Sequence, residues 1–139
     1  MTTGTMLRII AETRDYYVAQ GQPFGWDNKR QECCYLNDRT GARCAIGRYI
    51  SNDAIEWLID FATTNFDQNG DWQYIGVSDL ARLKILPRAP VRFLQALQAT
   101  HDDVAYAEGV ADQPERYDAR EEMDQALDRL KAKVLAGQY

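Results

Sequence analysis

Apolar residues recur at helical spacing in four segments of this chain, and this recurrence limits its fold more than any other feature of the sequence. Within each segment the apolar positions lie three or four residues apart, so they share one face of a helix and form a stripe that packs against a neighbour. The predicted helices cover residues 5–20, residues 53–69, residues 90–105 and residues 115–136. Amphipathic helices in this number predict a domain in which helices pack on helices.

The segment between the first two predicted helices has a strand-like composition instead. Two short runs, residues 31–36 and 42–46, flank a turn-forming cluster from Asn37 to Gly41, and this order predicts a β-hairpin. Further along, residues 71–77 predict a short extended piece and residues 80–83 a brief helix. The fold class predicted from the sequence is therefore α+β, mainly α, with about four helices packed with one small β-hairpin.

The length and composition of the chain predict a single domain over residues 1–139. The chain has 139 residues, of which 45% are hydrophobic and 27% charged, the balance of a packed globular protein. At this size folding buries roughly two-thirds of the surface of the unfolded chain, so a disulfide or a structural metal is not required.

The distribution of charge disfavours nucleic acid as a general partner. The net charge is −5, and residues 100–139 account for it with five bases against ten acids. Residues 22–50 are mildly basic, with five bases against three acids. Because binding to phosphate backbones depends on cations that release counterions, an acidic chain is not expected to bind nucleic acid in general.

The cysteines and the termini favour the cytoplasm as the location of the protein. Cys33, Cys34 and Cys44 are an odd number, whereas secreted domains usually carry paired cysteines. The N-terminal residues lack a basic region followed by an apolar run, so no signal peptide is predicted. No apolar stretch approaches the roughly 20 residues that span a bilayer, so no membrane partner is expected.

No catalytic, metal-binding or cofactor motif is found in the sequence, so an enzyme is the less favoured prediction. His101 is the single histidine, and with three cysteines it does not give the ligand spacing of a zinc site. His101-Asp102-Asp103 is similar to the start of a phosphohydrolase metal site, but the further histidines of that site are missing. We expect His101 and the cysteines to be buried structural residues. A disulfide between Cys34 and Cys44, and a pairing of either cysteine with His101, stay open as alternatives.

The mildly basic segment is the candidate ligand-binding region. Guanidinium groups beside aromatic rings suit a phosphate or a nucleotide base. The residues predicted to bind such a ligand are Arg39, Arg43, Arg48, Tyr35, Trp26 and Tyr49. The alternative interpretation is a solvated hairpin face with aromatic residues that belong to the core.

Two segments resemble a pattern found in small uncharacterised proteins of bacteriophages and prophages. The first is Cys33-Cys34-Tyr35, a polar turn that ends in Gly41, and then Arg43-Cys44-Ala45-Ile46-Gly47-Arg48. The second is Phe93-Leu94-Gln95-Ala96-Leu97-Gln98, with His101-Asp102 just beyond it. The resemblance implies a phage origin and expression in the cytoplasm of a bacterial host, and it brings no activity with it.

Two functions from different classes follow from these observations. The first is a non-enzymatic phage accessory protein that binds a host protein, with inhibition of a bacterial defence system as a specific form of that role. The alternative is a protein that binds a nucleotide or another small anion through the arginine-rich hairpin. A homo-oligomer is expected in either case, since symmetric oligomers are common.

Overall fold

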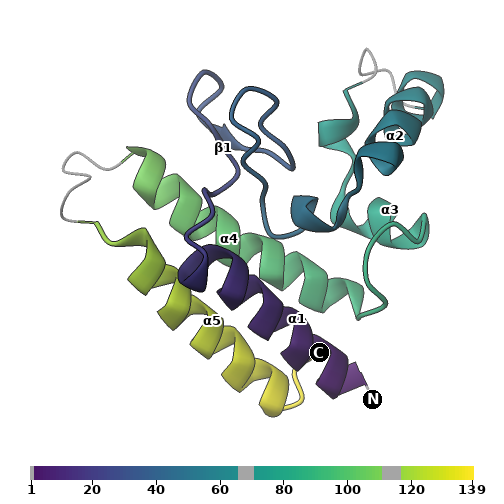
Figure 1. Ribbon diagram of the computed structural model, residues 1–139. Coiled ribbons are helices and arrows are strands. Elements are labelled where there is room, and N and C mark those ends of the chain that lie inside the picture. Colours follow the sequence, from purple (N-terminus) through teal and green to yellow (C-terminus); the bar gives the residue numbers. More distant parts are fainter. Residues whose placement is uncertain (1, 66–70, 111–116) are drawn as a thin grey trace.

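The computed structural model describes residues 2–65, 71–110 and 117–139, and these form a mainly helical fold with one small antiparallel sheet (Figure 1). The described α-helices are α1 (Thr2–Arg14), α2 (Asn52–Asn65), α3 (Val77–Arg82), α4 (Val91–Val110) and α5 (Ala119–Leu135). Shorter elements are the π-helical turn η1 (Asp15–Ala19), the 3-10 helices η2 (Gly47–Tyr49) and η3 (Trp72–Tyr74), and the strands β1 (Trp26–Asp27) and β2 (Glu32–Cys33). The predicted fold class, α+β and mainly α, is confirmed.

Helices α1, α4 and α5 pack together and form the larger part of the structure. Figure 1 shows α5 running back alongside α4, with α1 lying along the pair in a similar direction. Buried residues of α5 fall at helical spacing, as the sequence predicted: Ala119, Met123, Leu127, Leu130 and Val134. Arg14 at the end of α1 forms ion pairs with Asp124 and, at 2.7 Å, with Asp128 of α5. Apolar burial and these ion pairs therefore hold α1 against α5.

The predicted helices are present, with shifted ends. α5 begins at Ala119 because the side chain of Asp118 accepts a hydrogen bond from the Glu121 backbone N–H at 3.1 Å, the contact of an N-cap residue. The earlier start predicted at residue 115 and the end of the second helix predicted at residue 69 lie outside the described residues.

The small β-hairpin is present, but its position was predicted wrongly. The paired strands are β1 and β2, with Trp26 opposite Cys33, rather than residues 31–36 and 42–46. Between those two predicted runs the pairing is a single bridge, Leu36 to Arg43. Residues 44–46 are fully buried and lead directly into η2. This segment therefore packs into the core and enters a helical turn, and it does not form the second strand that its composition predicted.

The extended piece predicted over residues 71–77 is also wrong. This stretch contains η3, at whose start the Asp71 side chain accepts a hydrogen bond from the Gln73 backbone N–H at 3.1 Å. Trp72 is buried and stacks on Tyr35 with 5.9 Å between ring centroids. The brief helix predicted after it is confirmed as α3.

The buried apolar residues form one continuous cluster to which all five described α-helices contribute. Helix α2 is the least enclosed of the long helices, since it buries only Leu58 and Ala62 among its described residues. In Figure 1 it lies apart from the group formed by α1, α4 and α5. None of the described helices is both long and apolar enough to cross a membrane.

Candidate functional site

His101 lies at the centre of a buried polar network on the inner side of α4. Its side chain is completely buried. Nε2 accepts a hydrogen bond from the Gly25 backbone N–H at 3.0 Å, and Nδ1 lies 2.9 Å from Oδ1 of Asp102. Because Nε2 accepts from an amide, the ring proton resides on Nδ1 and is donated to Asp102. Both ring nitrogens of the neutral imidazole are therefore occupied.

Gln98 extends this network to the segment that follows the hairpin. Its Nε2 donates to Oδ1 of Asp102 at 2.9 Å, and its Oε1 accepts from the Ile46 backbone N–H at 3.1 Å. The network thus joins α4 to two separate backbone segments, at Gly25 and at Ile46. The two sequence segments that resemble phage proteins, residues 33–48 and 93–102, are consequently packed against each other.

Two glycines allow the close backbone approaches that this packing needs. A Cβ atom at Gly47 would lie 1.9 Å from the Tyr35 carbonyl oxygen, and one at Gly25 would lie 2.4 Å from the Cys44 backbone nitrogen. Both neighbours are backbone atoms that cannot turn aside. These positions therefore require glycine for steric reasons.

Cys33, His101 and Asp102 form the group of described residues that comes nearest to a metal site. One ligand atom from each lies within 4.8 Å of the others. A metal ion on His101 would need a ring lone pair, but Nε2 already accepts from Gly25 and Nδ1 carries the proton. Metal binding here would have to break the network, so the residues fit a structural role better than a metal centre.

The described cysteines are poor nucleophiles in this fold. All three are free thiols. Burial is the main cause that raises the pKa of Cys34 to about 11 and that of Cys44 to about 12, and burial also raises the pKa of Cys33 well above its usual range. Since the thiolate is the reactive form, these thiols stay protonated and unreactive near neutral pH. The hydrogen bonds of His101 go to Gly25 and Asp102 and not to a thiol.

The predicted ligand-binding arginines Arg43 and Arg48 have partners inside the protein. Arg43 donates to the carbonyl oxygens of Gly47 and Ile50, at 2.9 and 2.7 Å. Arg48 donates to Oγ1 of Thr13 at 2.7 Å, and its guanidinium lies 4.1 Å from the centroid of the Tyr49 ring. These two arginines therefore stabilise the turn around η2 and its contact with α1.

The remaining predicted ligand-binding residues are spread over different surfaces. Tyr35 is buried and donates to the Ile75 carbonyl oxygen at 2.6 Å. The Trp26 ring packs edge-on against Tyr106 of α4, at 5.9 Å between centroids. Arg39 is exposed and pairs with Asp27 at 3.1 Å. The structure therefore brings Arg48 and Tyr49 together but does not gather the six residues around one cavity.

Arg39 instead lines a separate hollow of about 610 Å³ between the hairpin region and η3. Its basic residues lie among acidic ones: Lys29, Arg30 and Arg39 with Asp27, Asp38 and Asp71. Arg30 is 3.5 Å from Asp71, so opposite charges neutralise one another along this wall. The hollow offers mixed charge rather than a surplus of positive charge.

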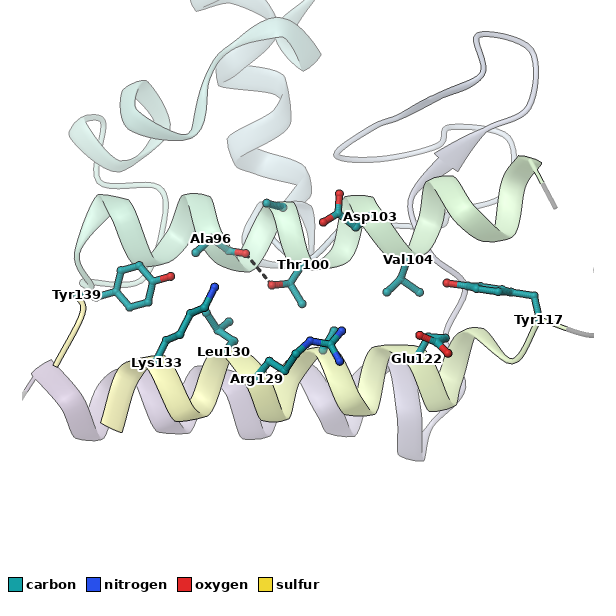
Figure 2. Close-up of a pocket in the computed structure, with 12 residues that line it drawn as sticks. Ala96, Thr100, Asp103, Val104, Tyr117, Glu122, Arg129, Leu130, Lys133 and Tyr139 are labelled. Carbon is teal, nitrogen blue, oxygen red and sulfur yellow. Dashed lines mark hydrogen bonds between the residues drawn. The ribbon is translucent and has the colours of Figure 1, made fainter. Parts of the chain in front are cut away.

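A groove of about 420 Å³ runs between α4 and α5 on their outer side (Figure 2). Figure 2 shows Lys133 near Tyr139 at one end of the groove and Glu122 near Tyr117 at the other. Arg129 and Asp103 lie between these ends. All four charged residues are exposed, and none forms an ion pair with another described residue.

The outer face of α2 is the second described surface whose charged groups form no ion pair with another described residue. Trp57 is 50% exposed and stacks on Phe61 at 5.2 Å between centroids. Asp53 and Asp60 lie one helical turn before and after Trp57, so they share its face. Helix α2 contains three carboxylates and no lysine or arginine. The face is therefore aromatic at its centre and acidic at its edge.

No protein-family model, curated protein or solved structure matches this chain. Its function must therefore be argued from the contacts and charges described above. The inner network on α4 is fully satisfied within the protein and fits a structural role. The outer groove and the α2 face have groups available for a partner.

Proposed function

We propose that this protein is a non-enzymatic accessory protein that binds a host protein, and that helix α2 makes the contact. The observation that carries the proposal is the 50% exposure of Trp57 on a helix whose buried residues are only Leu58 and Ala62 in the described structure. The apolar residues of α2 extend beyond its buried stripe, since Ile59 is also 41% exposed. Exposed tryptophan is also a residue type that often anchors protein interfaces.

The chemistry of the α2 face indicates what the partner presents. An indole ring is best received by an apolar pocket, and carboxylates around it favour lysine or arginine at the rim of that pocket. None of Asp53, Glu56 and Asp60 forms an ion pair within the described structure, so all three are available. A second copy of α2 would place acids against acids, which argues for a different protein as the partner.

The state of the reactive groups supports a role without catalysis. The described thiols are held protonated, and both nitrogens of His101 are engaged in the inner network. The resemblance to phage proteins supplies the biological setting for the proposal: a bacterial cytoplasm, with a host protein as the partner. Inhibition of a defence system is the specific form of this role that the setting favours.

The alternative function, binding of a small anion by the arginine-rich hairpin, has less support. Of the three predicted arginines, Arg39 alone lines the hollow beside the hairpin, where acids accompany it. Arg43 and Arg48 would have to leave carbonyl or hydroxyl acceptors before they could bind a ligand. The alternative stays a prediction that anion titration of the purified protein can test.

Capture from bacterial lysates with matched variants tests the proposal. Wild-type protein is expected to retain a stoichiometric host protein whose affinity falls at least about 30-fold in Trp57→Ala, the effect of losing an interface anchor. Asp53→Lys with Asp60→Lys is expected to slow association, and the difference should shrink in high salt.

Leu135→Ala is the matched control for this experiment. Leu135 is 62% exposed on α5, so the variant removes a comparable apolar side chain from a different surface. It is expected to retain the partner fully. A partner held equally by wild type and Trp57→Ala would show that α2 is not the contact. Repeated failure of folded wild-type protein to retain any partner would contradict the proposal itself.

A further inference from the structure

The α4–α5 groove carries opposite charges at its two ends. Lys133 lies at the end marked by Tyr139, and Glu122 lies at the end marked by Tyr117 (Figure 2). These two residues are eleven positions apart on α5, or about 16 Å along the helix axis. Arg129 of α5 and Asp103 of α4 lie between these two ends, so the middle of the groove carries both signs of charge.

The floor of the groove is apolar, and three of its five side chains are alanine. It consists of Ala96, Ala99, Val104, Ala126 and Leu130. Thr100 also faces the groove, but its hydroxyl is already bonded to the Ala96 carbonyl oxygen at 2.8 Å. Small residues on two adjacent helices let other helices approach closely, so the surface suits helix packing.

The opposite charges at its two ends make the groove complementary to a reversed copy of itself. A two-fold axis that crosses α5 near its middle, between Glu122 and Lys133, exchanges the two ends of the groove. The Lys133 end of one copy then lies over the Glu122 end of the other, and the reverse contact follows by symmetry. Two-fold dimers require this self-complementarity, because the same patch serves both subunits.

We infer that the α4–α5 groove is a homodimer interface in which a second copy of this chain packs its own α4 and α5 against the first, reversed end to end. Each dimer contains two equivalent contacts between Glu122 and Lys133 of the partner subunit. The groove receives no residue from α2, so the dimer leaves the α2 face available.

Two variants with grooves of a single charge sign test this interface. Arg129→Glu with Lys133→Glu makes the groove wholly acidic, and Asp103→Lys with Glu122→Lys makes it wholly basic. All four residues are exposed and form no ion pair with another described residue, so both variants are expected to fold like wild type, which circular dichroism checks. Native mass spectrometry and sedimentation velocity report the oligomeric state.

The interface predicts a distinctive pattern. Wild type is a dimer, each single-sign variant alone dissociates at least about tenfold more readily, and an equimolar mixture of the two variants forms a heterodimer of intermediate mass. The chain with all four substitutions regains the homodimer. Wild type that stays monomeric at high concentration overturns the inference, as does a monomer that carries a bound small molecule. Variants that dimerise as strongly as wild type also overturn it, because the dimer must then use another face.

Discussion

Helix α4 carries polar residues on two opposite sides, and the two groups differ in where their partners lie. On the inner side, Gln98, His101 and Asp102 satisfy one another and two backbone N–H groups. On the outer side, Asp103 shares the groove with charged residues of α5 but pairs with none of the described ones. His101 and Asp103 are only two positions apart in the sequence, yet helical geometry turns them about 200° from each other.

This difference separates stability from binding. A polar group that is buried and hydrogen-bonded inside the protein stabilises the fold. When it is removed, its former partner stays buried without a hydrogen bond, which lowers stability. A charged group that lacks an internal partner contributes little to the fold and is available to another molecule. The α2 face and the groove both carry charged groups of this second kind. Those of the α2 face are all carboxylates, whereas those of the groove include both carboxylates and cations.

Replacement of His101 is expected to give the largest loss of stability. His101→Ala removes a fully buried ring whose centroid lies 5.3 Å from that of Tyr17 and 5.5 Å from that of Phe24. It leaves the Gly25 N–H without its acceptor and the Asp102 carboxylate with Gln98 but without the His101 N–H. The combined cavity and desolvation effects should lower the free energy of unfolding by about 3 kcal/mol or more, as measured by urea denaturation.

Asp103→Ala is the matched control two residues away. It should leave the free energy of unfolding nearly unchanged, because Asp103 is exposed and forms no ion pair within the described parts of the chain. Similar losses in the two variants would contradict the separation between the inner and outer sides of α4.

Arg43 and Arg39 allow the same comparison within the basic segment. Arg43→Ala removes the guanidinium donor from the Gly47 and Ile50 carbonyl oxygens, although Gly47 keeps the bond from the Ile50 N–H, and should lower the free energy of unfolding by about 2 kcal/mol. Arg39→Ala breaks an exposed ion pair with Asp27 and should change stability little. If Arg43→Ala instead abolished anion binding at unchanged stability, the ligand-binding interpretation of the hairpin would be restored.

The buried thiol of Cys44 makes stability fall at alkaline pH. Its pKa is raised from the usual 9.0 to about 12, chiefly by burial. Above pH 9 the unfolded chain loses this proton while the folded chain retains it, so the free energy of unfolding decreases as pH rises. For Cys44 the decrease between pH 9 and 10 should be about 1 kcal/mol.

Cys44→Ala isolates this contribution through the slope of stability against pH. The variant also loses the contact from the Gly47 N–H to Sγ, so its absolute stability will differ from that of wild type. Its slope between pH 9 and 10 should nevertheless be shallower. Equal slopes would mean that Cys44 ionises in the folded protein as easily as in the unfolded chain.

Most of the helical fold could be predicted from the sequence, because periodic apolar stripes depend on local spacing. The stripe Met123, Leu127, Leu130 and Val134 of α5 is buried as its spacing indicated. The hairpin was harder to place, since its short runs have too few residues to fix a register. The Ile46 backbone N–H in this buried segment bonds to Gln98, which lies 52 positions away and gives no local signal in the sequence.

The candidate sites were less accessible to sequence reasoning. Positive charge beside aromatic residues suggested a ligand site, but the arginines bond to carbonyl and hydroxyl acceptors that a sequence does not reveal. The sequence did hold a signal for the exposed face of α2, because this helix has more large apolar residues than one buried face can hold. They are Ile55, Trp57, Leu58, Ile59 and Phe61. The groove could not be found this way, because Arg129 and Lys133 also suit the C-terminal end of any helix.

The smallest expected effects on stability belong to the two ends of the groove. Glu122→Gln and Lys133→Gln each remove one exposed charge that lacks an internal partner, so the free energy of unfolding of the monomer should change by less than about 0.5 kcal/mol. In the proposed dimer the same single substitution removes two contacts, because the two-fold axis repeats each of them.

Exposed ion pairs contribute about 0.2 to 1 kcal/mol each, so the loss of two should raise the dissociation constant of the dimer roughly 2- to 30-fold, as measured by sedimentation equilibrium. The double variant Glu122→Gln with Lys133→Gln should add little to either single one, since both remove the same pair of contacts. Full additivity would mean that Glu122 and Lys133 contact different groups, and the two-fold arrangement would then be wrong.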